Sequence, residues 1–277
     1  MVVFSHSRLS TFEQCKLKYR FRYIDKIVPD IDKTIESHLG TIVHSALEWL
    51  YTEIKEKSRI PTIDEVITKY AEEWQDNYED EIPIVRRDMQ VKDYFNKGIK
   101  FLIDYYSKHK PFQDKTIAVE KEIIFNLDEE GKYKIRGFID RLVYNLQTKE
   151  YEVHDYKTSG RLPTDEAIKN DRQLALYSIA IKEIYGQQHK GVALVWHYLS
   201  FNKRLDSKRT NDQLEQLKKE TIDLIKEIEN TTQFPYKKSS LCHWCEYKAI
   251  CPAWGNKPPE KQLTLGEYVN KLKESKD

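Results

Sequence analysis

The stretch Y-E-V-H-D-Y-K-T-S, residues 151–159, joins a short strand to two charged side chains. Its first half is rich in aromatic and β-branched residues, as β-strands are. Side chains alternate between the two faces of a strand, so Val153, Asp155 and Lys157 project to one side. Burying a carboxylate and an ammonium there costs free energy unless they pair, bind a metal or meet a substrate. Asp155 and Lys157 are therefore a candidate reaction centre, although so short a motif also fits a simple ion pair on a half-exposed strand.

Two more strands are predicted before this stretch, over Lys115–Leu127 and Tyr133–Leu146, separated by turn-forming residues. The second contains G-F-I-D, which places Asp140 among apolar neighbours. An isolated buried carboxylate is costly, so Asp140 should have a cation or strong donors nearby. A structural pairing with an arginine would satisfy the same requirement. Glu120, on the preceding strand, is a candidate extra metal carboxylate, but we favour a structural role for it.

After the central stretch, Thr164 and Asp165 can cap a helix that runs to about Tyr185. Gln173 and Tyr177 lie four residues apart and hence on one face of it. Core packing explains Tyr177 easily and Gln173 less well. The pattern then predicts a buried strand, a hairpin return and an amphipathic helix, over 192–198, 201–208 and 211–230.

Before the strands the sequence is mainly helical. A helix over 38–57 points His44 inward beside Gly40, which permits close approach, although a lone inward histidine is more often an ordinary core residue. Residues 62–110 are predicted to form a helical insertion or cap without a recognisable chemical motif. Candidate substrate contacts there are Arg86, Arg87 and Lys92, with an ordinary solvated surface as the competing interpretation.

The composition bounds the partners and the compartment. No apolar run in the 277 residues approaches the roughly 20 that a membrane span needs, and the N-terminus lacks the apolar core of a signal peptide. We therefore expect a soluble, cytoplasmic protein without a membrane partner. Charged residues make up 33% and nearly cancel, giving a net charge of +1, so any nucleic-acid surface must be local.

The four cysteines are Cys15, alone near the N-terminus, and the C-x2-C-x5-C cluster of Cys242, Cys245 and Cys251. The helical pattern of residues 5–26 puts Cys15 on a packed face. In a reducing cytosol this arrangement favours a four-thiolate metal site over two disulfides. Ligand chemistry alone does not decide between zinc and a four-iron four-sulfur cluster.

Taken in order, these motifs resemble the RecB-like branch of the PD-(D/E)XK nuclease superfamily, which carries G-x-x-x-H, G-x-x-D, (D/E)-x-K and Q-x-x-x-Y. The matching pairs here are Gly40 and His44, Gly137 and Asp140, Asp155 and Lys157, and Gln173 and Tyr177. The opening S-x-L-x-x-F-x-x-C and the closing cysteine cluster resemble the iron-sulfur members, including CRISPR-associated RecB-like exonucleases and AddB-type nuclease domains. Ile139 replaces the proline of the superfamily's name, and Asp155 stands where many relatives have glutamate; both variants occur in the RecB branch.

The resemblance implies an α/β fold with a restriction-endonuclease-like central mixed sheet flanked by helices. It implies a single nuclease domain over 1–254, with an insertion at 62–110 and a cluster at 242–254 that Cys15 completes. An iron-sulfur cluster would thus join the N- and C-terminal regions, and residues 255–277 would be a charged tail. The spacing and Pro252 resemble iron-sulfur nucleases more than a zinc ribbon, and His6 and His243 are interpreted as bystanders.

The resemblance also implies roles for the motif residues. His44, Asp140, Asp155 and the backbone carbonyl of Tyr156 would bind Mg²⁺ or Mn²⁺, since carboxylates suit magnesium and an imidazole suits manganese. Lys157 would orient the attacking water and stabilise developing negative charge. Gln173 and Tyr177 would position the lysine and the scissile phosphate.

The leading hypothesis from the sequence is therefore a metal-dependent DNA nuclease, an exonuclease acting on single strands or free ends, with a 4Fe-4S cluster as a structural support. One alternative is a non-catalytic DNA-end binding or processing subunit within a helicase-nuclease or CRISPR adaptation complex. Another is a zinc-stabilised nucleic-acid binding module. DNA repair and CRISPR adaptation both use the fold implied by the resemblance, so the pathway stays open.

Overall fold

The computed structural model describes residues 2–29, 33–79, 82–84, 86, 88–186 and 190–258. It divides the chain into two compact units, where the sequence suggested one domain. The first comprises Met1–His6 and Lys33–Glu229, and the second comprises Ser7–Asp32 and Asn230–Asp277. All four motif pairs fall in the first unit, and all four cysteines fall in the second.

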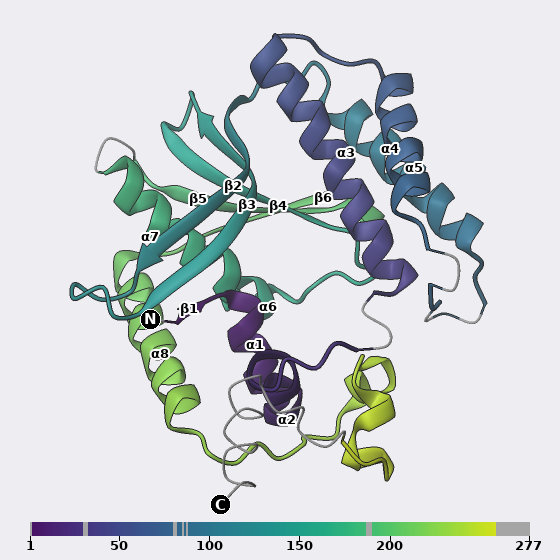
Figure 1. Cartoon of the computed structure of the whole chain (residues 1–277). Coiled ribbons are helices and arrows are strands. Elements are labelled where there is room, and N and C mark those ends of the chain that lie inside the picture. Colours follow the sequence, from purple (N-terminus) through teal and green to yellow (C-terminus); the bar gives the residue numbers. More distant parts are fainter. Residues whose placement is uncertain are drawn as a thin grey trace, which may run out of the picture. The chain divides into compact units, whose positions relative to one another are not determined.

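A six-stranded mixed sheet is the centre of the first unit, which confirms the predicted α/β architecture (Figure 1). Its order is β1-β3-β4-β5-β6, with β2 also paired to β3. The β4–β5 and β1–β3 pairs are parallel, and the others are antiparallel. The strands are β1 (Val3–Phe4), β2 (Lys115–Asn126), β3 (Lys134–Asn145), β4 (Glu150–Lys157), β5 (Val192–Tyr198) and β6 (Lys203–Lys208).

Three long helices form a hydrophobic core beside this sheet, and the first of them packs directly on β2 and β3. They are α3 (Ile35–Lys57), α4 (Ile63–Asn77) and α5 (Val91–His109), and Tyr156 of β4 is part of their core. The insertion at 62–110 thus contains α4 and α5 among its described residues. Both α3 and α4 begin with capping boxes, in which Thr34 and Thr62 accept a hydrogen bond from the backbone three residues on.

The predicted helix from Thr164 to Tyr185 is two helices, which corrects the sequence prediction. They are α6 (Asp165–Lys169) and α7 (Arg172–Tyr185), and α8 (Asn211–Asn230) follows β6. The break has a local cause, because Asp171 adopts an extended conformation and its Oδ1 accepts a hydrogen bond from Leu174 N at 2.9 Å. The new helix start places Gln173 in the first turn of α7, which packs on β4 and β5.

The arginine Arg141 of β3 is fully buried and pairs with His154 of β4. Arg141 stacks 4.0 Å from the ring centroid of Tyr51 and hydrogen bonds with His154 Nδ1 at 2.9 Å and Asp114 at 3.2 Å. His154 in turn contacts His197 Nε2 at 2.8 Å. A buried guanidinium needs such partners to offset its lost hydration, so this network joins β3, β4, β5 and α3.

The second unit brings the N-terminal segment against residues 234–247. Its helical turns are α1 (His6–Gln14), α2 (Lys16–Tyr19), η1 (Arg20–Ile24), η3 (Ser240–Trp244), η4 (Lys248–Ile250) and η5 (Pro252–Trp254). Tyr19 stacks on Phe234 with 6.5 Å between ring centroids, and Tyr247 donates to Ile27 O at 3.0 Å. Lys18 pairs with Glu246 at 2.7 Å. These contacts join the two segments independently of any bound group.

The prediction that one helix carries Cys15 on its packed face is wrong. The helix stops at Gln14, and Cys15 is extended, with φ −161° and ψ 112°, before α2 begins. Its side chain is half-buried. Across the described residues, no helix has both the length and the apolar character needed to cross a membrane.

Candidate active site

The candidate site lies where β3 and β4 stop pairing. Their ladder ends at the Arg141–His154 pair. Beyond that point the Tyr156 N–H donates to Asp140 Oδ2 at 2.8 Å instead of to a strand neighbour. Where the strands separate, this backbone donor therefore binds the Asp140 carboxylate.

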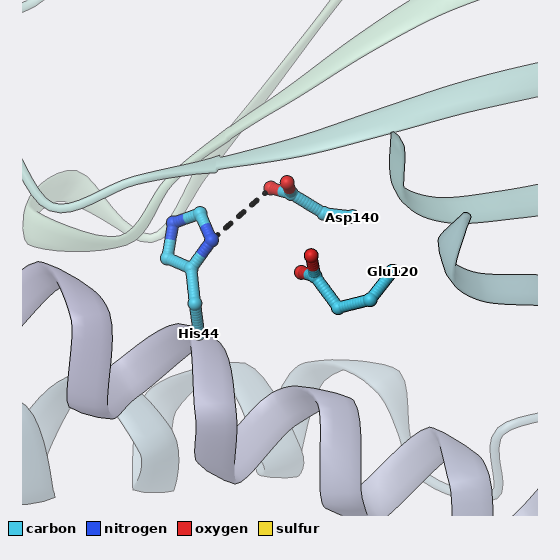
Figure 2. Close-up of side chains that lie close together, drawn as sticks. All are labelled: His44, Glu120 and Asp140. Carbon is cyan, nitrogen blue, oxygen red and sulfur yellow. Dashed lines mark ion pairs between the residues drawn. The ribbon is translucent and has the colours of Figure 1, made fainter. Parts of the chain in front are cut away.

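His44 of α3 contacts both Tyr156 and Asp140. Its Nε2 lies 2.7 Å from Tyr156 O, and its Nδ1 lies 3.4 Å from Asp140 Oδ2 (Figure 2). Since a carbonyl only accepts, Nε2 carries the proton of the first contact. Nδ1 then either holds a second proton for the carboxylate or offers a lone pair to a cation. The one imidazole thus spans two predicted metal ligands.

Glu120 of β2 is the third member of this group, although the sequence favoured a structural role for it. One ligand atom from each of His44, Glu120 and Asp140 lies within 4.8 Å of the others, and Figure 2 shows both carboxylates facing the imidazole. Glu120 has φ +42°, a left-handed conformation that is rare for a side chain of this size. Such backbone strain clusters at functional sites. Alternating strand periodicity gives no signal for it.

Negative charge is concentrated at the site. Burial and then the neighbouring Asp155 carboxylate raise the pKa of Asp140 to about 7, although the Tyr156 N–H and Lys157 oppose the shift. Burial and then Asp140 raise the pKa of Glu120 to about 7. Asp155 thus makes Asp140 harder to ionise, and Asp140 makes Glu120 harder to ionise, a situation that a bound cation relieves.

Asp155 and Lys157 point to the same side of β4, as predicted. Lys157 Nζ donates to Asp155 Oδ1 at 2.9 Å and lies 2.8 Å from Oδ2, which is buried and accepts no well-aligned hydrogen bond. Burial opposes the charged form of Lys157, but the Asp155 and Asp140 carboxylates outweigh it and raise the pKa of the ammonium. The lysine is therefore a fixed positive charge at the site.

Gln173 and Tyr177 of α7 extend from this pair to β3. Gln173 Oε1 accepts from Lys157 Nζ at 3.5 Å, and the Tyr177 hydroxyl is hydrogen-bonded to the Gln173 side chain and to the Phe138 backbone. The Tyr177 ring also occupies the space that a Cβ on Gly137 would fill. The glycine of G-F-I-D thus admits the tyrosine of Q-L-A-L-Y.

The donor set fits a hard divalent cation. Carboxylate oxygens, a carbonyl oxygen and an imidazole are ligands that Mg²⁺ and Mn²⁺ accept. Raised carboxyl pKa values and a buried carboxylate oxygen without a good donor indicate uncompensated negative charge. The structure thus brings His44, Glu120 and Asp140 together directly, while Asp155 is held chiefly by Lys157.

The other predicted contacts lie elsewhere or outside the described residues. Arg86 pairs with Asp88, and both are largely exposed. Lys92 is exposed near the start of α5. Arg87 and the part of the charged tail after Pro258 lie outside the residues that the structure describes.

In the second unit, Cys15, Cys242, Cys245 and Cys251 line one pocket as free thiols. Apolar side chains, including Leu17 and Phe21, and the lysines Lys18, Lys237 and Lys248 also line it. The Ser239 N–H donates to Cys242 Sγ at 3.3 Å, and burial raises the pKa of the Cys245 thiol. Four sulfur ligands around one largely apolar pocket fit a thiolate-bound metal or cluster.

Comparisons with known proteins find a family whose model covers most of the chain. The model described as the PD-(D/E)XK nuclease superfamily matches residues 3–252. One relative, a subunit of an ATP-dependent helicase/deoxyribonuclease from Carboxydothermus hydrogenoformans, is 27% identical over 244 residues, or 78% of this chain. The match covers only 22% of that relative's length. A solved structure described as the crystal structure of SSO0001 is 16% identical with a TM-score of 0.37, covering 79% of this chain and 95% of that one.

Proposed function

This chain belongs to the PD-(D/E)XK nuclease superfamily, and we propose from that premise that it is a Mg²⁺- or Mn²⁺-dependent DNA nuclease. The observation that carries the proposal is the approach of His44, Glu120 and Asp140 to one another, beside the Asp155–Lys157 pair. A divalent cation at such a site relieves charge repulsion at a phosphodiester and lowers the pKa of a bound water. The ligands would be His44, Asp140, Asp155 and the Tyr156 carbonyl, with Glu120 as a further carboxylate.

Lys157 would orient the attacking water and stabilise the negative charge that develops on the phosphate. The Asp155 and Asp140 carboxylates raise the pKa of its ammonium in the metal-free protein, so the lysine is positively charged there. Gln173 would hold the ammonium in place, and Tyr177 would hold Gln173. These assignments divide the site into metal ligands, one charged side chain, Lys157, and two positioning residues, Gln173 and Tyr177.

We further propose that the substrate is single-stranded DNA or a free DNA end, and that cleavage is exonucleolytic. The alternative is a non-catalytic DNA-end processing subunit of a helicase-nuclease or CRISPR adaptation complex. The similarity to a protein named as part of a helicase/deoxyribonuclease favours a helicase as a partner. The intact Asp155–Lys157–Gln173 chain favours the enzyme over the non-catalytic subunit.

The cysteine pocket would hold a 4Fe-4S cluster. Four thiols from two segments more than 200 residues apart in the chain converge on it. The apolar wall and the Ser239 N–H hydrogen bond to Cys242 sulfur are features that stabilise and tune such clusters. The cluster would add a covalent link to segments that already pack together.

The test is a cleavage time course on end-labelled single- and double-stranded DNA with Mg²⁺, Mn²⁺ or EDTA. Lys157→Ala should bind metal and remain folded but lose activity by about 10²–10³-fold, the cost of removing one preorganised charge-stabilising group. Asp155→Ala should also be inactive, while Lys219→Ala, an exposed lysine of α8, should cleave normally. Wild-type turnover in Lys157→Ala would contradict its role. No cleavage by a folded, iron-loaded preparation would favour the non-catalytic subunit.

A further inference from the structure

Positive charge is concentrated in the cysteine-bearing unit, although the whole chain has a net charge of only +1. Its described residues, 7–29 and 230–258, contain ten Lys and Arg against three Asp and Glu. Two of those acids are engaged within the unit, since Asp25 pairs with Arg20 at 3.0 Å and Glu246 with Lys18 at 2.7 Å. The described part of this unit therefore carries a local excess of positive charge, of the kind that a nucleic-acid partner needs.

Large apolar side chains are exposed in the same unit. Trp244 is 56% exposed, Tyr236 is 49% exposed and Leu241 is 56% exposed, all within nine consecutive positions. Large apolar side chains that gather on a surface keep apolar area in contact with water, and a partner that covers them gains free energy. The neighbouring Lys237, Lys238 and Lys248 are also exposed.

Two of these lysines are held against one indole ring. Lys238 Nζ and Lys248 Nζ each lie 4.8 Å from the ring centroid of Trp254. His243 packs edge-on to the same ring at 5.2 Å. Both ammonium groups thus lie over the same indole ring, and Lys238 Nζ also donates to Ala253 O at 3.4 Å, so two positive charges gather around Trp254.

We propose that this basic aromatic surface, comprising Tyr236, Lys237, Lys238, Trp244 and Lys248, binds single-stranded DNA. Bases stack on the exposed Trp244 and Tyr236, and phosphates bind the lysines. Aromatic platforms interleaved with cations are the usual means of holding single strands without sequence preference. A protein-binding site fits less well, because lysine is depleted from the cores of protein interfaces. The inference rests on DNA being the substrate of the proposed nuclease and adds a second, non-catalytic contact.

The experiment measures binding separately from cleavage. Fluorescence anisotropy of a 5′-labelled oligothymidylate in EDTA reports affinity without hydrolysis. Trp244→Ala should weaken binding about tenfold or more, as expected for the loss of one stacked base, and Trp244→Phe should restore part of it. Phe201→Ala, a control at another exposed aromatic position in the first unit, should bind normally. Iron content and melting temperature check that each variant is folded.

The lysines provide an independent readout if Trp244→Ala is unstable. Replacing Lys238 and Lys248 together by glutamine should weaken binding and reduce the slope of log affinity against log salt by about 1.4, or about 0.7 per lost phosphate contact. Unchanged affinity and slope in the folded variants would overturn the proposal and assign the surface to a protein partner. Binding that depends on Trp244 in a protein that never cleaves DNA would support this surface and contradict the nuclease function instead.

Discussion

Replacing Gly137 by alanine tests how the glycine and tyrosine motifs depend on each other. A Cβ at this position would lie 2.6 Å from Tyr177 Cζ and 2.8 Å from its hydroxyl oxygen, with Cε1 closer still. Carbon atoms prefer separations of about 3.5–4.0 Å, so the ring must withdraw by about 1 Å or more. Overpacking costs about 1–3 kcal/mol. Loss of the hydroxyl's hydrogen bonds to Gln173 and Phe138 adds about 0.5–1.5 kcal/mol.

The expected loss in the free energy of unfolding is about 2–4 kcal/mol, or about 5–15 °C in melting temperature for a domain of this size. Activity should fall as well, by more than about tenfold in kcat, because the displaced ring no longer holds Gln173 against Lys157. Thermal unfolding and single-turnover cleavage measure the two effects at a temperature where the variant is folded.

Gly98→Ala is a matched control, because a Cβ there would collide with the Tyr70 ring, 2.8 Å from its Cε2, in the α4–α5 pair. It should lower stability to a similar extent and leave kcat unchanged. The double variant Gly137→Ala/Tyr177→Leu should regain stability without regaining activity. Wild-type stability and turnover in Gly137→Ala would refute the account of this contact, and equal kcat losses in both alanine variants would show that general instability causes the effect.

Two further predictions concern the metal ligands and the cysteines. The raised pKa of Asp140, about 7 against an ordinary 3.8, means that the folded protein keeps a proton that the unfolded chain releases, so the metal-free fold loses stability as pH rises from about 4 to about 7. Asp140→Asn should therefore be more stable than wild type in EDTA, by up to about 4 kcal/mol at pH 8 and by less at pH 5. The variant should also lose the stabilisation that Mg²⁺ gives the wild type. Equal urea midpoints for the two proteins at pH 8 would contradict this prediction. Cys15→Ala should lower iron content and melting temperature together, and wild-type values of both would exclude the proposed link between the chain segments.

Much of the fold follows from periodicity and capping in the sequence. The strands over 115–127, 133–146 and 192–198 and the helix over 211–230 were predicted to within a few residues, because strand-forming residues or helical spacing mark each of these segments. Two errors have a common physical cause. At Cys15 and at Asp171 a single residue in an extended conformation interrupts an otherwise continuous helical pattern, and spacing alone does not reveal such a break.

Candidate site residues were predictable where motif order carried the signal and not where geometry did. The motifs pointed to His44, Asp140 and Lys157, which lie on α3, β3 and β4. The position of the Glu120 side chain depends on the left-handed backbone conformation of this residue within a strand, and no local sequence pattern predicts that conformation. The Arg141 network was also invisible, since its partners come from α3, β4 and β5 and meet only in three dimensions.

Tyr156 links these predictable and unpredictable parts. Its N–H donates to Asp140 and its carbonyl accepts from His44, so its backbone lies at the candidate metal centre. Its ring packs against three other rings, with centroid distances of 5.5 Å to Tyr105, 5.3 Å to His197 and 5.8 Å to His44. Ligands bind a metal well only when their positions are fixed in advance by surrounding packing. The buried network of Arg141, His197 and Tyr105 therefore fixes the position of the Tyr156 backbone before a metal binds. This packing offsets the repulsion between the carboxylates of the site, which opposes folding.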